Sequence, residues 1–562
     1  MQRFHQPGNF RSFPSKQRGV ALMVMLVIMV VGAATFLVSS LASSAIKIER
    51  DKTTANALAQ AKEALIGYAI RDTNHPGSLP CPDVNDDGKL TIATPPPYPD
   101  FNGGSCTSLI GRLPWITLGL PELRDGAGEH LWYAVSKPFA AVGNPSINSE
   151  TQGTLSISGT NPSSQVIAIV FAPGQVLNGT SRSASVTATC SSLKDSPTVA
   201  QSWCATNYLE GSNATLNYSS SLNLNYQSAD TSSTFNDRMI FITHKDLMPL
   251  VEKRIAREVK GCLDGYAAAP ANAGTYPWAA PVNDTTYTGT TDTLFGRLPK
   301  SNTYSPTVQQ LLDGLAALQA ALNNYSAKPS STTAITALQT AGTTLKTYAL
   351  AQTPTTAAPL DQASLNQAAN AGDYALSPHT PSPGATPDTQ FVTSLQSQIN
   401  QAYTFFASPQ HGNVTPGWAL SSCTIFSSSN SYWDDWKNLV FYQIADGYKP
   451  GVSSPSCGAS PNTCLSIAGS GNTVAGSGTY RAAVIVAGRK LGSQMRDNPA
   501  ANPPDDYLAN TTSENSSDPS FVTNAHNNTA LTTTFITYKL SDPNYPMVND
   551  LVLCLDGRNN CK

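Results

Sequence analysis

The feature that most constrains this chain is an apolar run near its N-terminus. Residues Val20–Val38 contain no charged side chain. At a helical rise of about 1.5 Å per residue, this run is just long enough to cross a hydrocarbon core of about 30 Å. Helix-compatible sequence continues after it without a break. We therefore expect one long N-terminal helix over residues 20–73, with a transmembrane part at about 20–42.

The residues before the apolar run predict its orientation. They include Arg3, Arg11, Lys16 and Arg18 and no acidic side chain. Basic flanks stay on the cytoplasmic side, so the bulk of the chain should be exported. A cleaved secretory signal is the alternative, with the small residues near Ala45 as its cleavage region. Against it, the apolar run is longer than the usual core of about 7–15 residues, and no clear A-x-A site follows.

The segment Lys16–Gly19, followed by Val20, resembles the leader of type IV prepilins. In that family a membrane peptidase cuts after the glycine, and the new N-terminal residue is methylated. The resemblance implies a leader over 1–19 and a cut between Gly19 and Val20. Major pilins carry Glu at the fifth mature position, where this chain has Val24. In this respect the chain is similar to minor, tip-located pilins and to the largest minor pseudopilin of type II secretion.

The resemblance covers only about residues 12–50, and it implies a structural role. The chain would be a minor pilin-like or pseudopilin-like subunit, at or near the tip of a type IV pilus or a type II secretion filament. Its partners would be other such subunits, the prepilin peptidase and the inner membrane. It would cross that membrane once, with periplasmic heads that become extracellular in a pilus. The alternative is an exported, membrane-anchored adhesin or binding module.

Composition supports export. Charged residues make up 13% of the 562 residues, and Gly and Pro number 39 and 40. An average globular chain has about 25% charged residues, so this composition is typical of an exported, loop-rich protein that contains β-structure. A formal net charge of −3 argues against nucleic acid as the main partner. The chain lacks G-x-S-x-G, H-E-x-x-H and P-loop motifs, so we expect no enzyme and name no catalytic residue.

Six short segments recur in the same order in the two halves of the chain. They are Ala64–Ala69 with Cys262–Ala267, Gly111–Pro114 with Gly296–Pro299, Leu155–Gly159 with Leu465–Gly469, Ile169–Ala172 with Ile485–Ala487, Asn207–Leu209 with Asp506–Leu508, and Phe241–Lys245 with Phe535–Lys539. This order predicts an α+β fold with a duplicated module, a helix packed on an antiparallel sheet. The first head is expected at 74–248 and the second at 249–562. A helix on an antiparallel sheet is also the form of a pilin head.

The second half carries an insertion at about 305–409. Leucines recur there at helical spacing from Leu311 to Leu322. Two further helical stretches are expected at about 332–351 and 389–406, separated by Pro-rich pieces. The insertion should form a small helical subdomain. It would be either a contact surface for a partner or a spacer.

The segment Asp83-x-Asn85-x-Asp87-Gly88 matches the first half of an EF-hand calcium loop. The twelfth position is Thr94 and not Glu, which excludes a complete EF-hand. A looser Ca²⁺ site would use Asp83, Asn85 and Asp87, completed by backbone carbonyls or a distant acid. The alternative is a polar Asx turn without a metal.

Ten cysteines in an exported chain predict disulfides. Sequence neighbours suggest four short bridges and leave one long one, although spacing alone does not fix the connectivity. The pairs are Cys81/Cys106, Cys190/Cys204, Cys457/Cys464, Cys554/Cys561 and Cys262/Cys423.

Overall fold

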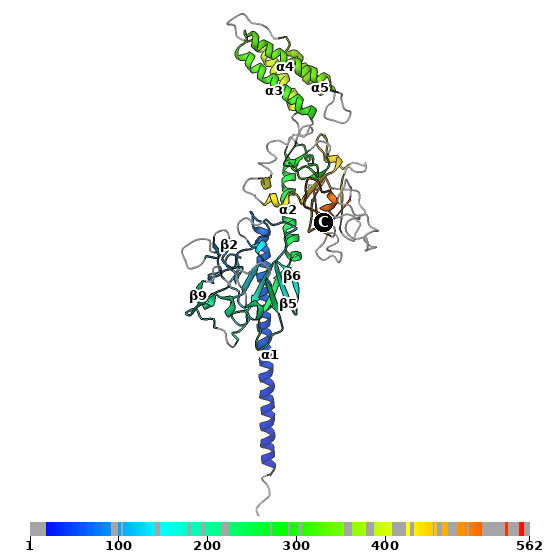
Figure 1. The fold of residues 1–562 in the computed structure, drawn as a ribbon. Coiled ribbons are helices and arrows are strands. Elements are labelled where there is room, and N and C mark those ends of the chain that lie inside the picture. Colours follow the sequence, from blue (N-terminus) through cyan, green and yellow to red (C-terminus); the bar gives the residue numbers. More distant parts are fainter. Residues whose placement is uncertain are drawn as a thin grey trace, which may run out of the picture.

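The structure is a computed structural model that describes residues 18–555 with internal gaps. The longest gaps are 91–98, 215–223, 353–361, 378–386, 407–422, 470–479, 509–533 and 538–549. Within the described residues the chain is a mixed α+β fold. It has an N-terminal helix, two four-stranded antiparallel sheets and a helical insertion (Figure 1).

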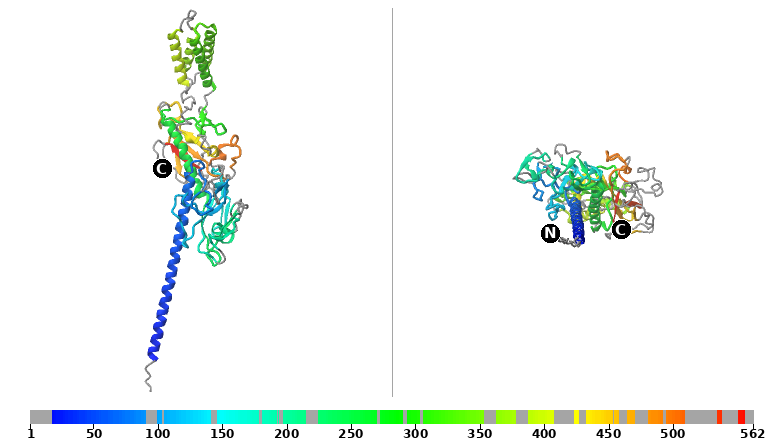
Figure 2. Two further views of the ribbon diagram at one scale, coloured as in Figure 1. Left: turned by 90° about the vertical axis from the view of Figure 1, so that its left-hand side faces the viewer. Right: turned by 90° about the horizontal axis from the view of Figure 1, so that it is seen from below.

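Helix α1 (Arg18–Arg71) is a single helix of 54 residues, which confirms the predicted long N-terminal helix. Its C-terminal part is buried in the first head through an apolar stripe that includes Leu58, Ala61 and Leu65. Its N-terminal part extends away from the heads as a bare stem (Figures 1 and 2). Apolar side chains on that stem are exposed, from 52 to 73% over Leu22–Val31.

The predicted membrane span at about 20–42 lies partly outside the described side chains. Among the residues that are described, no helical segment combines the length and the hydropathy that a membrane span requires.

The first head has a four-stranded antiparallel sheet in the order β11-β7-β4-β3. Its strands are β3 (Ile110–Arg112), β4 (Trp132–Val135), β7 (Ala168–Ala172) and β11 (Arg238–Ile242). Helix α1 packs on β7 and β11. A second small sheet places β5 (Leu155–Gly159) between β6 (Ser163–Val166) and β10 (Asn225–Ser228). The β5/β10 pair is parallel.

The first head also contains two short hairpins. They are β1 (Phe101–Asn102) with β2 (Ser105–Cys106), and β8 (Thr187–Thr189) with β9 (Thr198–Ala200).

The second head repeats this architecture. Its sheet has the order β13-β15-β17-β19, with β13 (Phe295–Arg297), β15 (Val440–Ile444), β17 (Ala482–Val486) and β19 (Leu551–Leu555). Helix α2 (His244–Ala268) packs on β17 and β19, as α1 does on β7 and β11. Strands β16 (Ser466–Gly469) and β18 (Thr534–Thr537) form a parallel pair, as β5 and β10 do. Two short strands, β12 (Thr288–Gly289) and β14 (Ser301–Asn302), also pair in parallel.

The register of the sheets corrects two of the predicted sequence matches. Strand β18 pairs with β16 as β10 pairs with β5, so β18 holds the place of β10, and β19 holds that of β11. The match of Phe241–Lys245 with Phe535–Lys539 was therefore wrong. In the central strands Phe171 and Ile485 hold equivalent places, whereas the predicted match began by aligning Ile169 with Ile485. Short β-branched segments look alike in sequence, and only their pairing partners distinguish them.

The two heads share one continuous hydrophobic core along α1 and α2. Lys62 on α1 forms an ion pair of 2.9 Å with Asp246 in the first turn of α2. Arg254 on α2 donates hydrogen bonds to the backbone oxygens of Ile70 (2.6 Å) and Asp72. A cation bound to the last carbonyls of a helix satisfies groups that lack intrahelical partners and complements the helix dipole. Helix α2 therefore caps the C-terminus of α1.

In its described residues the insertion is a bundle of four helices with its own core. They are α3 (Pro306–Ala327), α4 (Thr332–Leu350), α5 (Gln362–Tyr374) and α6 (Thr389–Phe406). The prediction of a helical insertion is confirmed, but it missed α5. The buried face of α5 consists mostly of small residues, among them Ala368, Ala369 and Ala371, which give little contrast in a hydropathy pattern. The bundle lies at the end of the molecule opposite the bare stem (Figures 1 and 2).

Four of the predicted disulfides are present. They are Cys81–Cys106, Cys190–Cys204, Cys262–Cys423 and Cys457–Cys464, with Cα–Cα distances of 5.4, 5.4, 4.4 and 5.3 Å. For the fifth predicted pair, Cys554 lies on β19, and Cys561 lies outside the described residues. Four closed bridges are typical of proteins that fold outside the cytoplasm.

Candidate functional site

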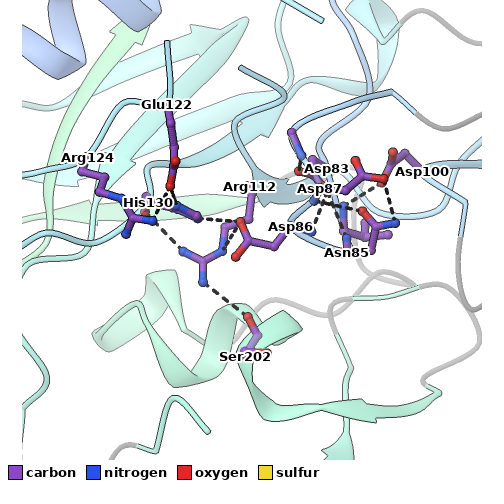
Figure 3. Close-up of polar contacts among 12 residues, drawn as sticks. Asp83, Asn85, Asp86, Asp87, Asp100, Arg112, Glu122, Arg124, His130 and Ser202 are labelled. Atoms are coloured by element: carbon purple, nitrogen blue, oxygen red, sulfur yellow. Dashed lines mark hydrogen bonds and ion pairs between the residues drawn. The ribbon is translucent and has the colours of Figure 1, made fainter. Parts of the chain in front are cut away.

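The main candidate site is an acidic cluster in the first head, formed by the loop that starts at Asp83 and by Asp100 (Figure 3). The Cys81–Cys106 disulfide joins the two segments that carry these residues. Asp83 also forms a β-bridge with Arg112 at the end of β3, which fixes the start of the loop against the sheet. The site is therefore anchored on both sides by the disulfide and by the sheet.

The carboxylate oxygens of Asp83, Asp87 and Asp100 lie within 4.8 Å of one another. Asp83 and Asp100 are fully buried, whereas Asp87 is exposed. Backbone N–H groups hold the two buried acids in place: Asp83 accepts from Asp86 at 2.8 Å and from Gly88 at 2.7 Å, and Asp100 accepts from Val84 at 2.7 Å.

Gly88 allows the loop to close. Its φ of +76° is in the left-handed region, and a Cβ there would lie 2.5 Å from the indole nitrogen of Trp115. Glycine is the residue that tolerates both constraints. The resulting bend directs the N–H of Gly88 at Asp83.

The electrostatics of the cluster favour a cation. The pKa of Asp83 is raised to about 7, mainly by burial and also by the nearby charges of Asp100 and Asp87, which together outweigh the backbone hydrogen bonds that lower it. Several carboxylates at one point are costly unless a positive charge or a proton neutralises them. Oxygen ligands of this kind suit Ca²⁺, which binds six to eight oxygens from carboxylates, carbonyls and water. The residues present therefore fit a calcium ion, held by Asp83, Asp87 and Asp100.

The structure brings the carboxylates of two predicted ligands, Asp83 and Asp87, together with that of Asp100. Asn85 lies beside the cluster, where its amide donates to Asp87 at 3.3 Å and its oxygen accepts from the N–H of Asp87. Asp100 is an acid of the kind that the sequence analysis offered, beside backbone carbonyls, as a way to complete the site. The predicted disulfide could have found it, because Asp100 is the only acid between Cys81 and Cys106 outside the Asp83–Asp87 stretch.

Asp86 points away from the cluster into a polar network (Figure 3). Its carboxylate contacts Nδ1 of His130 at 2.7 Å, and Nε2 of His130 contacts Glu122 at 2.5 Å. These two carboxylates raise the pKa of His130 against the effect of burial, with the Asp86 hydrogen bond as the largest cause. The guanidinium of Arg112 lies 3.8 Å from Asp86. This network connects the loop to the edge of the sheet.

The second head has the same β-bridge, but with alanine in place of Asp83. There Ala280 pairs with Arg297 as Asp83 pairs with Arg112. The tyrosines on the adjacent strands behave alike: Tyr133 and Tyr442 donate to the backbone oxygens of Pro80 and Pro277. The module therefore folds with alanine at this position, so the buried carboxylate of Asp83 is not a requirement of the fold.

Each head also holds a pair of arginines around a tyrosine. In the first head Arg112 and Arg182 lie over the ring of Tyr208, at 4.0 and 4.6 Å. In the second head Arg297 and Arg496 lie over Tyr507, at 4.9 and 5.7 Å. Cations over aromatic faces are stabilising, most strongly when they are desolvated.

The backbone bonds of the two outer arginines also correspond. Arg182 donates to the carbonyls of Gly174 and Tyr208, and Arg496 donates to those of Gly488 and Tyr507. Sequence analysis missed this pair, because the residues that flank the two arginines differ. The side chains of Arg182 and Arg496 are buried and form ion pairs with Glu129 and Glu150, so we assign these two arginines to stability and not to ligand binding.

The predicted processing residues Gly19 and Val20 lie in the first turns of α1. No protein-family model, curated protein or solved structure matches the chain.

Proposed function

We propose that this chain is a minor subunit of the type IV pilin or type II pseudopilin kind, placed at or near the tip of a filament. The observation that carries the proposal is that the two halves of α1 have different surroundings. One half is packed in a head, and the other half presents apolar side chains to its surroundings. Burial of one large apolar side chain contributes about 1.5–3 kcal/mol. The stem therefore needs an apolar environment: lipid before assembly, and the helices of neighbouring subunits after it.

The heads support the same proposal. Two units with equivalent helices, strand orders and arginine–tyrosine clusters are what we expect from a duplicated helix-on-sheet module. We propose that both are pilin-like heads and that the second lacks a membrane half on its helix. Two heads and a helical bundle on one stem would obstruct repeated stacking, which favours a single copy at a tip.

Val24 favours the tip as well. In the resembling family, Glu at this position neutralises the methylated N-terminus of a neighbouring subunit. A subunit that is placed first has no such neighbour above it, and it can carry valine. The proposed processing is a cut between Gly19 and Val20 by the prepilin peptidase, followed by methylation. Before assembly the protein would cross the inner membrane once, with its heads in the periplasm.

A charge placed on the stem tests the proposal. Val27→Asp puts a carboxylate on a residue that is 58% exposed. We expect this variant to lose membrane retention and co-purification with filament subunits, because an unpaired charge is costly in lipid and in a packed helix bundle. Asn56→Asp, on the exposed face of the head-bound half of α1, is the matched control. Equal behaviour of the two variants would count against the proposal.

A second candidate is an exported adhesin or binding module in which the insertion at 305–409 is the contact surface. The observation that favours it is that the bundle has a core of its own, at the end of the molecule remote from the stem. Deletion of residues 306–406 should then abolish adhesion and leave filament assembly intact. Loss of assembly after this deletion would argue against a separate binding module.

A further inference from the structure

The helical insertion carries a polar groove between α5 and α6. Two cavities of about 650 and 900 Å³ lie along these helices, and both are lined by Gln367 from α5 and Gln401 from α6. Because they share these residues, they form the two ends of one groove. Helices α5 and α6 pack directly against each other beneath it. The floor of the groove is therefore fixed by the core of the bundle.

Uncharged amides and hydroxyls dominate the lining. Within the described part of the chain, the side-chain amides of Gln367, Asn370 and Gln398 make no hydrogen bond. Each amide offers both donors and acceptors. A ligand with hydroxyl groups can therefore pair with them without breaking a bond inside the protein.

One aromatic ring at the groove has a fixed orientation. Tyr374 stacks on Phe391 from α6 with a centroid distance of 5.4 Å and an interplanar angle of 12°. Tyr374 nevertheless stays 37% exposed, while Phe391 is buried. The negative face of an aromatic ring attracts weakly positive hydrogens. A preoriented tyrosine thus suits the C–H face of a sugar ring.

The charges of the lining exclude other ligand classes. No cation lines the described groove, so it has no attraction for phosphate or carboxylate groups. Its one carboxylate, Asp373, forms an ion pair of 2.5 Å with Lys346. An apolar ligand would leave the amides without water or partners, at a cost for each polar group. A neutral polyhydroxylated ligand satisfies all of these conditions.

We propose that the groove between α5 and α6 binds a neutral oligosaccharide. This inference rests on the second candidate function and names the ligand class of its contact surface. Hydroxyls would bond to the amides of Gln367, Asn370 and Gln398, and a sugar ring would lie on Tyr374. Cavities on both sides of the glutamine pair indicate a ligand of several sugar units.

An array of neutral oligosaccharides, probed with the purified full chain in detergent, tests the proposal. The array should include β-1,4-glucans, chitin oligomers, α-glucans, mannans and N-acetyllactosamine chains. We expect binding to at least one series, with affinity that rises with chain length. Tyr374→Ala and the double variant Gln367→Ala with Gln401→Ala should each weaken that binding at least tenfold.

Matched controls lie on α6 but outside the groove lining: Tyr403→Ala and Gln390→Ala should bind as the parent chain does. The glutamine variant removes only exposed amides, so it tests the groove even if Tyr374→Ala unfolds the bundle. Absence of binding to every neutral series, or unchanged affinity in the glutamine variant, would overturn the proposal. The array measures the isolated chain, so a failure of filament assembly would not affect its result.

Discussion

Removal of calcium should destabilise the first head through the cluster of Asp83, Asp87 and Asp100. Carboxylates at 4.8 Å repel each other by about 3.5 kcal/mol per pair at an effective dielectric of about 20. The rise of the Asp83 pKa from 3.8 to about 7 corresponds to about 4 kcal/mol at 1.4 kcal/mol per unit. Burial is the largest cause of this rise, and the charges of Asp100 and Asp87 add to it. A bound cation that offsets one carboxylate repulsion should contribute about 3 kcal/mol to stability.

For a unit of this size, about 3 kcal/mol corresponds to a Tm difference of about 6–12 °C. The assay is thermal unfolding of the purified full chain at pH 7.5, in 1 mM CaCl₂ and in EGTA. We expect the parent chain to melt higher in calcium. Asp83→Asn should lose this response, and in EGTA it should be at least as stable as the parent because it removes a repelling charge.

The second head supplies the control. Asp284 follows the Ala280 β-bridge in that head, and its carboxylate accepts hydrogen bonds from the backbone N–H groups of Thr286 and Thr288. Within the described residues it belongs to no group of three His, Cys, Asp or Glu side chains that could hold a metal. Asp284→Asn should keep the full calcium response. Equal melting of the parent chain in calcium and in EGTA, or a full response in Asp83→Asn, would refute the reasoning.

Three further predictions concern stability. Gly342→Ala should destabilise the bundle by about 1–3 kcal/mol, because its Cβ would lie 2.5 Å from the carbonyl oxygen of Gly372. Gly67→Ala on α1, where a Cβ meets open space, should instead stabilise the protein by about 0.5–1 kcal/mol. Equal effects of the two substitutions in urea unfolding would contradict this prediction. Loss of the Cys262–Cys423 bridge, with a separation of 161 residues, should cost up to about 5 kcal/mol in the chain-entropy model; an unchanged Tm in the double serine variant would contradict it. Burial and Glu210 raise the pKa of Asp237 to about 8 from 3.8. The native state then binds the proton more tightly, so this group's contribution is full below pH 4 and falls by up to about 1.4 kcal/mol per unit towards pH 8. Asp237→Asn should flatten that slope in urea unfolding, and an unchanged slope would contradict the assignment.

The long helix and the helical insertion were predictable because each carries a strong periodic signal. The apolar run and the stripe through Leu58 and Leu65 indicate α1 without reference to any other part of the chain. The bundle was predictable where leucines mark the buried face and not where alanines do, as in α5. The prediction therefore missed α5 because of its low hydropathy contrast, and not because of a tertiary effect.

Features that depend on contacts between distant segments were harder to predict. The loop at Asp83 was predictable from its spacing, but Asp100 enters the cluster through a disulfide and a hairpin. The place of β18 depends on its pairing with β16, and two β-branched strands cannot be told apart without their partners. Arg182 and Arg496 hold equivalent positions in the two heads, but the residues that flank them in the sequence differ.

The mature N-terminus tests the central claim most directly. Mass spectrometry of the exported chain should be done in cells with and without the prepilin peptidase, with Gly19→Leu as a cleavage-site variant. In normal cells we predict a mature chain that begins at N-methylated Val20. In cells without the peptidase, and for the Gly19→Leu variant, we predict that the uncut precursor remains. A start near Ala45, or an uncut Met1 in normal cells, would contradict the assignment to the pilin class.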